Sequence, residues 1–192
     1  MADICNTLRG GQDLSCAIPE YIPFQEAKLI NKSDIEEATI SVDCETDEYN
    51  VDFKLKPGKK AFAFIASVNG NHVRGIDSLV RNDKGYAMWN HAMHFLFAGV
   101  DEASTCQREA LAKGSIVGAI KYNDGTVKIY GLENGMASEE YDYDLVEEEG
   151  LFPMVLSSLE GRSERYLPLV FNPSEGDAEA IFDNDFQELE DE

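Results

Sequence analysis

The sequence is short of basic residues, with 16 Lys and Arg against 37 Asp and Glu, and its formal net charge is −21. A protein that binds nucleic acid through the phosphates needs clustered Lys and Arg. A chain dominated by carboxylates instead repels nucleic acid and anionic membranes. The composition therefore argues against both as binding partners. The local exception is a run of lysines, Lys54, Lys56, Lys59 and Lys60.

Signatures of membrane insertion, secretion and redox chemistry are also missing. No apolar run approaches the length of about 18 residues that a membrane-spanning helix needs, and the N-terminal MADICNTLRGG lacks the basic and apolar regions of a signal peptide. The cysteines Cys5, Cys16, Cys44 and Cys106 form no CxxC pair, which argues against a zinc ribbon or a thioredoxin-type motif. We therefore expect synthesis in a reducing cytoplasm, with free thiols. In an oxidising medium, Cys5 and Cys16 would be a candidate disulfide pair.

Cofactor and metal motifs are absent as well. Gly10-Gly11 is not followed by the GK[ST] of a phosphate-binding loop, and Asp183-Asn184-Asp185 lacks the glycine and spaced glutamate of a calcium loop. His91 and His94 fall on opposite faces of a predicted strand, which disfavours a shared metal ion. We expect one of these histidines to be buried and hydrogen-bonded and the other to be exposed. No cofactor and no metal ion are predicted.

The sequence shows no recognisable arrangement of catalytic residues either. Cys106 falls on the expected buried face of a short helix, which favours a core thiol over a nucleophile. The many carboxylates lie in runs that look exposed, whereas acid–base catalysis depends on burial and a tuned pKa. Because no set of nucleophile, base and oxyanion donors emerges, we do not expect an enzyme.

The clearest local signals lie between residues 98 and 135. Asp101 can cap a helix that ends at Gly114, and one face of this helix carries Ala103, Cys106, Ala110 and Leu111. Two strands, 116–122 and 126–130, then flank a turn made of Asn123, Asp124 and Gly125. Asp-Gly tolerates positive φ and is typical of a tight hairpin. This unit is therefore predicted to be one helix followed by one β-hairpin.

Most of the remaining chain reads as strand. Alternating or continuous apolar patterns predict strands at 28–31, 38–43, 49–55, 61–68, 86–97, 151–159 and 166–171. The strand 61–68 is expected to be buried on both faces or at an interface, residues 71–86 to be mostly loop, and the last two strands to form a second hairpin. The predicted fold is mainly β: a β-sandwich or open barrel of about eight strands with one flanking α-helix.

Three regions are distinguished by composition. Residues 1–20 are expected to form an extended N-terminal arm, residues 21–173 the β domain, and residues 174–192 an acidic C-terminal tail. Phe182, Phe186 and Leu189 interrupt the acids of the tail, which predicts a solvated segment or, from the aromatic spacing, a docking segment. A second exposed acidic patch is predicted at Glu139, Glu140, Asp142, Asp144, Glu147, Glu148 and Glu149.

The order of these pieces resembles the major tail, or tail-tube, proteins of bacteriophages, especially those that infect Bacteroidetes. The matching stretches are CNTLRGGQDLSC, KLINKSDIEEATI, YAMWNHAMHFLF, TCQREALAKGSIVGAI and KYNDGTVKIYGLENGM. The resemblance covers most of the chain, and its most specific part is 106–136. The long acidic tail from Ser174 is not typical of that family and would suit a tail ring or adaptor subunit.

The resemblance implies a structural virion protein, made in the host cytoplasm and located in the tail. Six copies would join edge to edge into a ring with neighbouring tail proteins, and the genome would pass through the channel without specific binding. Acids such as those at 139–149 would keep the DNA off the wall. The run Lys54, Lys56, Lys59 and Lys60 would reach the next subunit or ring. The alternative is a soluble acidic protein that mimics DNA and blocks a DNA-binding partner.

Overall fold

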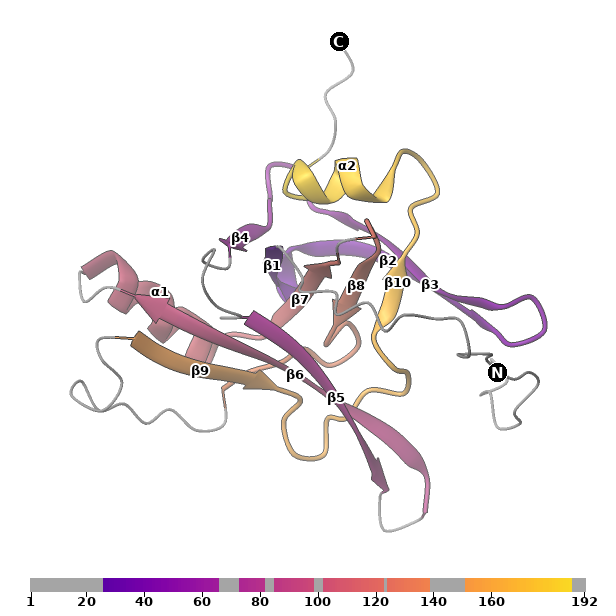
Figure 1. The fold of residues 1–192 in the computed structure, drawn as a ribbon, viewed down its shortest axis with the longest axis horizontal. Helices are drawn as coiled ribbons and strands as arrows, with labels where there is room; N and C mark the ends of the chain where they lie inside the picture. Colours follow the sequence, from indigo (N-terminus) through magenta and orange to yellow (C-terminus); the bar gives the residue numbers. More distant parts are fainter. Residues whose placement is uncertain are drawn as a thin grey trace, which may run out of the picture.

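Two β-sheets make up most of the computed structural model, which describes residues 26–65, 73–81, 85–98, 102–122, 124–138 and 151–187 (Figure 1). The larger sheet has seven strands in the order β2-β3-β10-β8-β7-β1-β4 and curls into a half-barrel. Only the β3–β10 pair among its neighbours is parallel. Its strands are β1 (Glu26–Asn31), β2 (Ile35–Asp43), β3 (Glu48–Leu55), β4 (Phe62–Ile65), β7 (Ile116–Lys121), β8 (Val127–Tyr130) and β10 (Leu169–Phe171).

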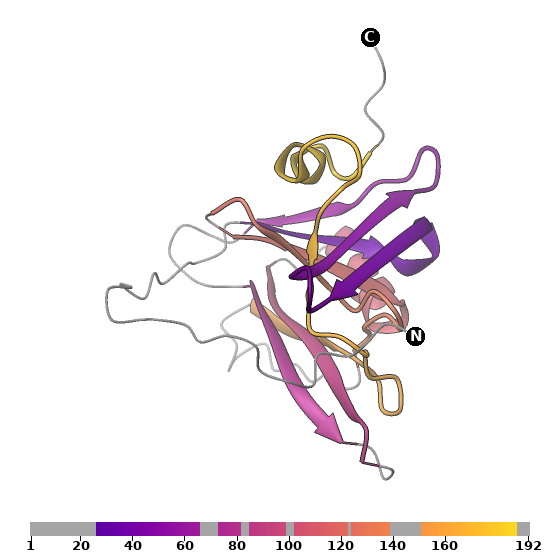
Figure 2. The same cartoon turned by 90° about the vertical axis from the view of Figure 1, so that its right-hand side faces the viewer.

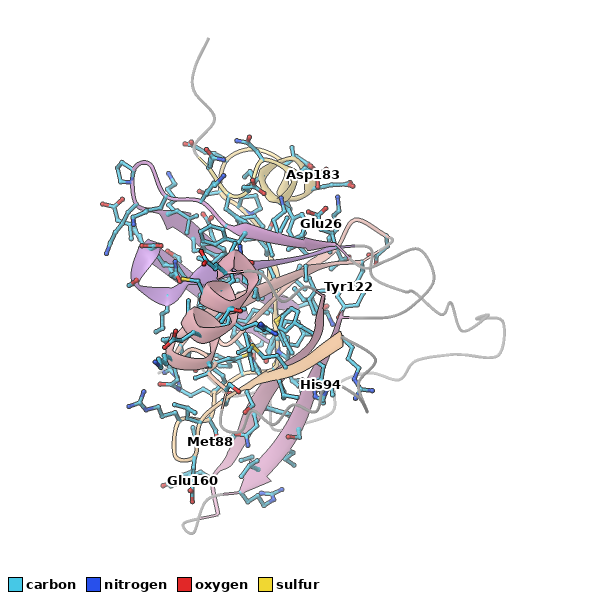
Figure 3. All side chains as sticks on the ribbon, turned by 90° about the vertical axis from the view of Figure 1, so that its left-hand side faces the viewer. Glu26, Met88, His94, Tyr122, Glu160 and Asp183 are labelled. Carbon is cyan, nitrogen blue, oxygen red and sulfur yellow. The ribbon has the colours of Figure 1, made fainter. Side chains whose placement is uncertain are left out.

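The smaller sheet has three strands in the order β5-β6-β9. They are β5 (Val73–Arg81), β6 (Ala87–Ala98) and β9 (Leu151–Ser157). The β5–β6 ends project beyond the larger sheet as an arm (Figures 1 and 2). Met88 and Glu160 lie toward this end of the molecule, whereas Glu26 and Asp183 lie toward the opposite end (Figure 3). Leu79 and Tyr86 on the arm are 50% and 67% exposed.

The hydrophobic core is divided into two clusters by the larger sheet. Strand β1 shows the division, because Ala27 and Leu29 belong to the cluster shared with the smaller sheet, whereas Ile30 belongs to the other cluster. Successive side chains of a strand point to opposite faces. Lys28 therefore shares its face with Ile30, away from the smaller sheet. The mainly β, sandwich-like fold class with few helices is confirmed.

The two sheets approach so closely that two crossing positions have no room for a side chain. A Cβ atom on Gly118 would lie 1.9 Å from Met93 Sδ, and one on Gly75 would lie 2.5 Å from the Tyr130 ring. Glycine in a strand interior commonly marks such a close approach of neighbouring groups. Gly118 therefore lets β7 pack directly against β6 of the smaller sheet, and Gly75 lets β5 pack directly against β8 of the larger sheet.

The helix α1 (Glu102–Lys113) ends where the sequence predicted it, but it is rotated from the expected orientation. Leu111 is buried, whereas Cys106 and Ala110 are exposed, so the expectation of a buried Cys106 is wrong. Small side chains offer little area to bury, and the helix instead buries the larger side chains of Leu111 and Arg108. The predicted cap Asp101 lies outside the described residues.

Three other expectations about strands are wrong. β4 lies at an edge of the larger sheet, and Phe62 and Ala63 are exposed, so burial on both faces is wrong for the described part of 61–68. The alternative, a strand at an interface, stays a prediction, and residues 66–68 lie outside the described part. Most of 71–86 forms β5 and is not a loop. β9 and β10 belong to different sheets and therefore form no hairpin. The N-terminal arm 1–20 lies outside the described residues.

Candidate functional site

The predicted contact residues lie at the end of β3, which contains Lys54, and in the loop to β4, which contains Lys56, Lys59 and Lys60. Two of these lysines fasten the loop to the 3-10 turn η1 (Lys32–Asp34): Lys56 Nζ donates to the Ser33 carbonyl at 2.6 Å, and Lys59 Nζ lies 3.2 Å from Asp34 Oδ1. The pKa of Asp34 is lowered first by a hydrogen bond from Asn31 and then by Lys59. Lys54 and Lys60 are exposed and form no ion pair with the described residues.

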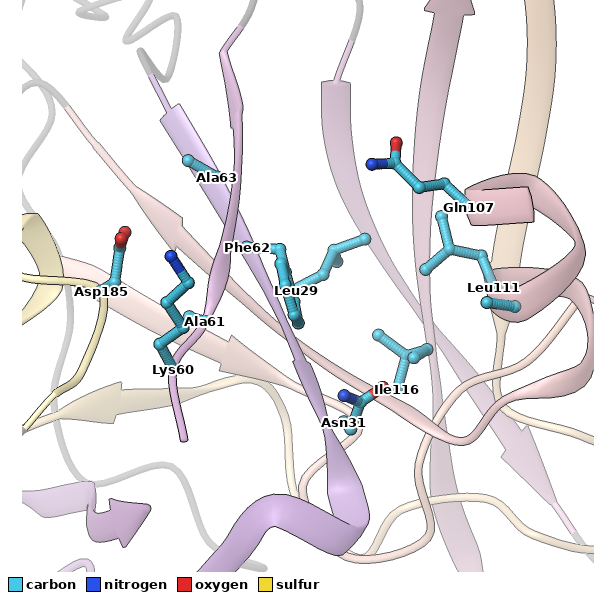
Figure 4. A pocket seen from close by; sticks show the side chains of 11 residues that line it. Leu29, Asn31, Lys60, Ala61, Phe62, Ala63, Gln107, Leu111, Ile116 and Asp185 are labelled. Atoms are coloured by element: carbon cyan, nitrogen blue, oxygen red, sulfur yellow. The ribbon is translucent and has the colours of Figure 1, made fainter. Parts of the chain in front are cut away.

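A pocket of about 400 Å³ opens beside β4, between this strand, β1 and α1 (Figure 4). Leu29, Leu111 and Ile116 give it an apolar lining. Phe62 forms part of its wall and is 51% exposed, and Lys60 lies at its rim on the side of Asp185. Within the described residues, the pocket therefore combines a strand at the edge of its sheet, an exposed aromatic ring and a lysine without an ion pair.

The opposite edge of the larger sheet, β2, has the reverse character. Glu36 and Glu37 are exposed on it, and the pairing with β3 slips between Ile35 and Glu37. Charges and bulges on an edge strand discourage uncontrolled pairing with another chain. β4 contains no charged residue. One edge of the sheet is thus acidic and irregular, and the other is apolar and flanked by lysines.

The predicted hairpin turn is present between β7 and β8, which pair antiparallel from Lys121 and Val127 onward. Asp124 Oδ1 accepts a hydrogen bond from Thr126 N at 2.9 Å, and this bond lowers the pKa of Asp124. Gly125 has φ of 83°, the left-handed region that glycine favours. Asn123 and the acidic patch 139–149 lie outside the described residues.

The two histidines of β6 behave as expected. His91 is buried, and His94 is partly exposed near Arg74. Gly131 N donates to His91 Nδ1 at 2.9 Å, so Nε2 carries the proton and donates to the Tyr166 carbonyl at 2.9 Å. Burial lowers the pKa of His91 to about 4. The ring is a neutral structural bridge between β6 and two loops.

Sequence reasoning missed a buried acid close to this bridge. Glu164 is 2% exposed, and its carboxylate accepts backbone hydrogen bonds from Glu133 and Asn134, both at 2.9 Å. Burial raises its pKa, against the lowering effect of the two backbone donors. Nothing distinguishes Glu164 from the many other acids of the sequence, so no local signal could have found it.

The C-terminal segment contradicts the expectation of a solvated tail. Residues 178–183 form α2 (Ala178–Asp183), and Phe182 and Phe186 are buried in the core cluster on the outer face of the larger sheet. Lys28 extends from β1 beneath this segment, where its Nζ donates to the Phe182 carbonyl at 2.5 Å and to Asp185 Oδ1 at 2.6 Å. The alternative expectation, a docking segment marked by its aromatic spacing, describes these residues. Residues 188–192 lie outside the described part.

The two cysteines in the described part of the chain are in different states. Cys106 is an exposed free thiol on α1, but Cys44 is disulfide-bonded, so the expectation of free thiols is wrong for Cys44. Within the described residues, no group of His, Cys, Asp and Glu is arranged to hold a metal ion. No helix in this part of the chain is long and apolar enough to cross a membrane.

No family model, curated protein or solved structure matches the chain.

Proposed function

We propose that the chain is a structural subunit that joins copies of itself into a ring of a bacteriophage tail. The observation that supports this proposal is the contrast between the two open edges of the larger sheet. β4 offers an uncharged edge beside an apolar pocket and Lys60, and β2 offers an edge with Glu36 and Glu37. Two different, complementary surfaces on one chain generate a head-to-tail contact, which closes into a ring when the rotation permits.

The charge of the chain fits a passive channel. Six copies at −21 each would carry −126 formal charges. A wall of carboxylates repels DNA phosphates weakly at many points, so a passing genome meets no deep well. The same repulsion acts between subunits, and the contacts of Lys54 and Lys60 with acids of a neighbour would offset part of it. Neighbouring tail proteins would extend the ring into a tail.

The edge contact is tested by adding a charge to β4. Ala63→Glu places a carboxylate on the exposed β4 edge, where it should repel the acidic β2 edge of a neighbouring copy and prevent the contact. Thr46→Glu adds the same charge at the exposed β2–β3 turn and serves as the control. We expect light scattering and negative-stain imaging to show rings for the parent and the control but not for Ala63→Glu.

The lysine contact has its own matched pair of variants. Lys60→Glu should weaken assembly, whereas Lys113→Glu, the same charge change at an exposed helix position, should not. Replacing all of Lys54, Lys56, Lys59 and Lys60 by Glu should abolish stacking. A parent chain that stays monomeric at high concentration would contradict the ring and favour the acidic DNA mimic, which a binding assay with basic proteins would then test.

A further inference from the structure

The outer face of the larger sheet contains a lysine at a position where an apolar side chain would be expected. Lys28 lies in the middle of β1, is 2% exposed, and shares its face with the core residue Ile30. A buried ammonium requires hydrogen-bonding partners. All the partners recorded for Lys28 except Glu26, at 3.7 Å, belong to the C-terminal segment.

We call Lys28, Lys121, Phe53 and Phe171 the Lys28 socket, and residues 177–187 the docking segment. The Lys28 ammonium lies 4.8 Å from the Phe182 ring centroid and Lys121 lies 5.4 Å from it, so this ring contacts two cations. Lys121 also pairs with Asp183 and with Glu179. Both lysines of the socket are therefore matched by carboxylates of the docking segment.

The aromatic half of the socket fixes the second phenylalanine. Phe186 stacks on Phe53 with ring centroids 5.1 Å apart and meets Phe171 edge-on at 5.3 Å. The Ala61 amide donates to the Asp185 carbonyl at 2.8 Å, which holds the intervening backbone. The socket thus recognises two phenylalanines four residues apart, with carboxylates at Asp183 and Asp185, and the carbonyl end of a short helix.

The connection to the docking segment is exposed. Asn172, Ser174, Glu175 and Gly176 are all exposed between β10 and the segment. Five extended residues span about 17 Å. Asp177 caps α2 from within the segment, because its Oδ1 accepts from Ala180 N at 3.0 Å. The N-terminal cap of α2 is therefore supplied by the docking segment itself.

A short tether makes charge recognition unnecessary for closure within one chain. Such a tether already provides an effective concentration of about millimolar, so apolar contacts would suffice. A buried ion pair adds little net stability, and its best-supported use is to specify which partner binds. A specific socket is useful where several segments compete for it, as they would between adjoining copies of the proposed ring.

From this geometry we infer that the Lys28 socket of one copy binds the docking segment of a second copy in the assembly. The inference rests on the proposed ring, because the ring supplies the adjoining copy. Exchange of an identical element keeps every contact of the closed chain and links the two copies at low energetic cost. The C-terminal segment thereby becomes a connector between subunits, in addition to their edge contacts.

The test mixes two full-length chains of different tag mass, both carrying Cys106→Ser. One carries Lys121→Cys and the other Asp183→Cys, two positions that pair across the socket, and both chains retain the Lys28–Asp185 pair, which is sufficient for recognition of the segment. The mixture is assembled and treated with a short bismaleimide, and heterodimers are measured by denaturing electrophoresis. A chain that carries both substitutions reports whether the two thiols are within reach. The control mixture combines Lys128→Cys with Val170→Cys, neighbours on paired strands that cannot exchange.

We expect more crosslinked heterodimers from the Lys121→Cys and Asp183→Cys mixture than from chains that carry Cys106→Ser alone, whose remaining native cysteines set the background, and no such increase from the control mixture. Assembly that yields only crosslinks within the doubly substituted chain would overturn the exchange and leave the ring intact. The remaining outcome is a chain that does not assemble. Light scattering identifies it, and a chain that stays monomeric would overturn both the ring and the exchange.

Discussion

The two faces of the seven-stranded sheet are closed in different ways. Against the smaller sheet, the contact depends on shape: Gly118 and Gly75 leave no space for a Cβ atom beneath Met93 and Tyr130. Against the C-terminal segment, the contact depends on charge and aromatic stacking around Lys28. The first interface is formed by strands held in sheets, whereas the second is formed by a segment on an exposed tether.

This difference separates stability from specificity. A tightly packed apolar contact tolerates few changes of volume but selects weakly among apolar partners. A buried ion pair contributes little net energy but discriminates strongly against a wrong charge. We therefore expect changes of volume to dominate at both faces, and changes of charge to affect mainly the choice of segment.

The largest effect is expected from Phe182→Ala. This ring is fully buried and contacts both Lys28 and Lys121, so its loss leaves a cavity under α2. Removal of a buried phenylalanine typically costs about 3–5 kcal/mol of unfolding free energy. Urea denaturation measures the change, and Phe62→Ala, at a ring that is 51% exposed, is the matched control. A loss as small as that of the control would mean that the segment adds nothing to the core.

A smaller loss of unfolding free energy is expected at low pH, because His91, on the side of the smaller sheet, becomes protonated. Its pKa is about 4 in the folded state, below the value of 6.5 for an unperturbed ring. The folded state therefore binds fewer protons, and stability present above pH 6.5 is lost as the pH falls toward 4. The full loss is about 3 kcal/mol, at 1.36 kcal/mol per pKa unit.

Urea denaturation of the parent and of His91→Gln across this pH range isolates the effect. Glu164 titrates with the opposite sign, because its pKa is raised by burial, and the difference between the two chains removes its contribution. Parallel stability curves for the two chains would contradict a neutral, buried His91.

Gly118→Ala should cost less, about 1–3 kcal/mol, which is typical of overpacking in a core. Its Cβ would lie 1.9 Å from Met93 Sδ, and a flexible methionine can move part of the way. Thermal or urea unfolding measures the loss. Adding Met93→Val should recover part of it, since the smaller side chain vacates the contested space; simple additivity of the two losses would argue against this clash.

Local signals predicted the parts of this fold that depend on neighbouring residues. The alternation of 49–55 appears as β3, the Asp-Gly turn joins β7 to β8, and His91 and His94 point to opposite faces. Each is fixed by strand periodicity or turn chemistry within a few residues. Pairing between distant strands carries no such signal, which is why β9 and β10 read as one hairpin although they lie in different sheets.

The candidate sites were harder to predict because they depend on contacts between residues that lie far apart in the sequence. The acids of 174–187 indicated a solvated tail, and only the spacing of Phe182 and Phe186 indicated docking. Their partner, Lys28, lies 154 residues from Phe182 in the sequence. The apolar run that contains Phe62 indicated a strand buried on both faces or at an interface; burial within one chain requires a second neighbour, and β4 has none within the described sheet.

Lys28→Met is expected to have the smallest effect on stability and therefore tests the comparison most sharply. Methionine removes the cost of burying an ammonium, and Asp185, which is 32% exposed, can be hydrated instead. Removing one partner of an ion pair is costly when the other charge stays buried, but Asp185 remains accessible to water, so we expect a change below about 1 kcal/mol. Asp185→Lys should then destabilise the parent but leave Lys28→Met nearly unchanged, as a double-mutant cycle in urea would measure. Equal costs of Asp185→Lys in both backgrounds would show that Lys28 does not select the segment, and the distinction drawn between the two faces would fail.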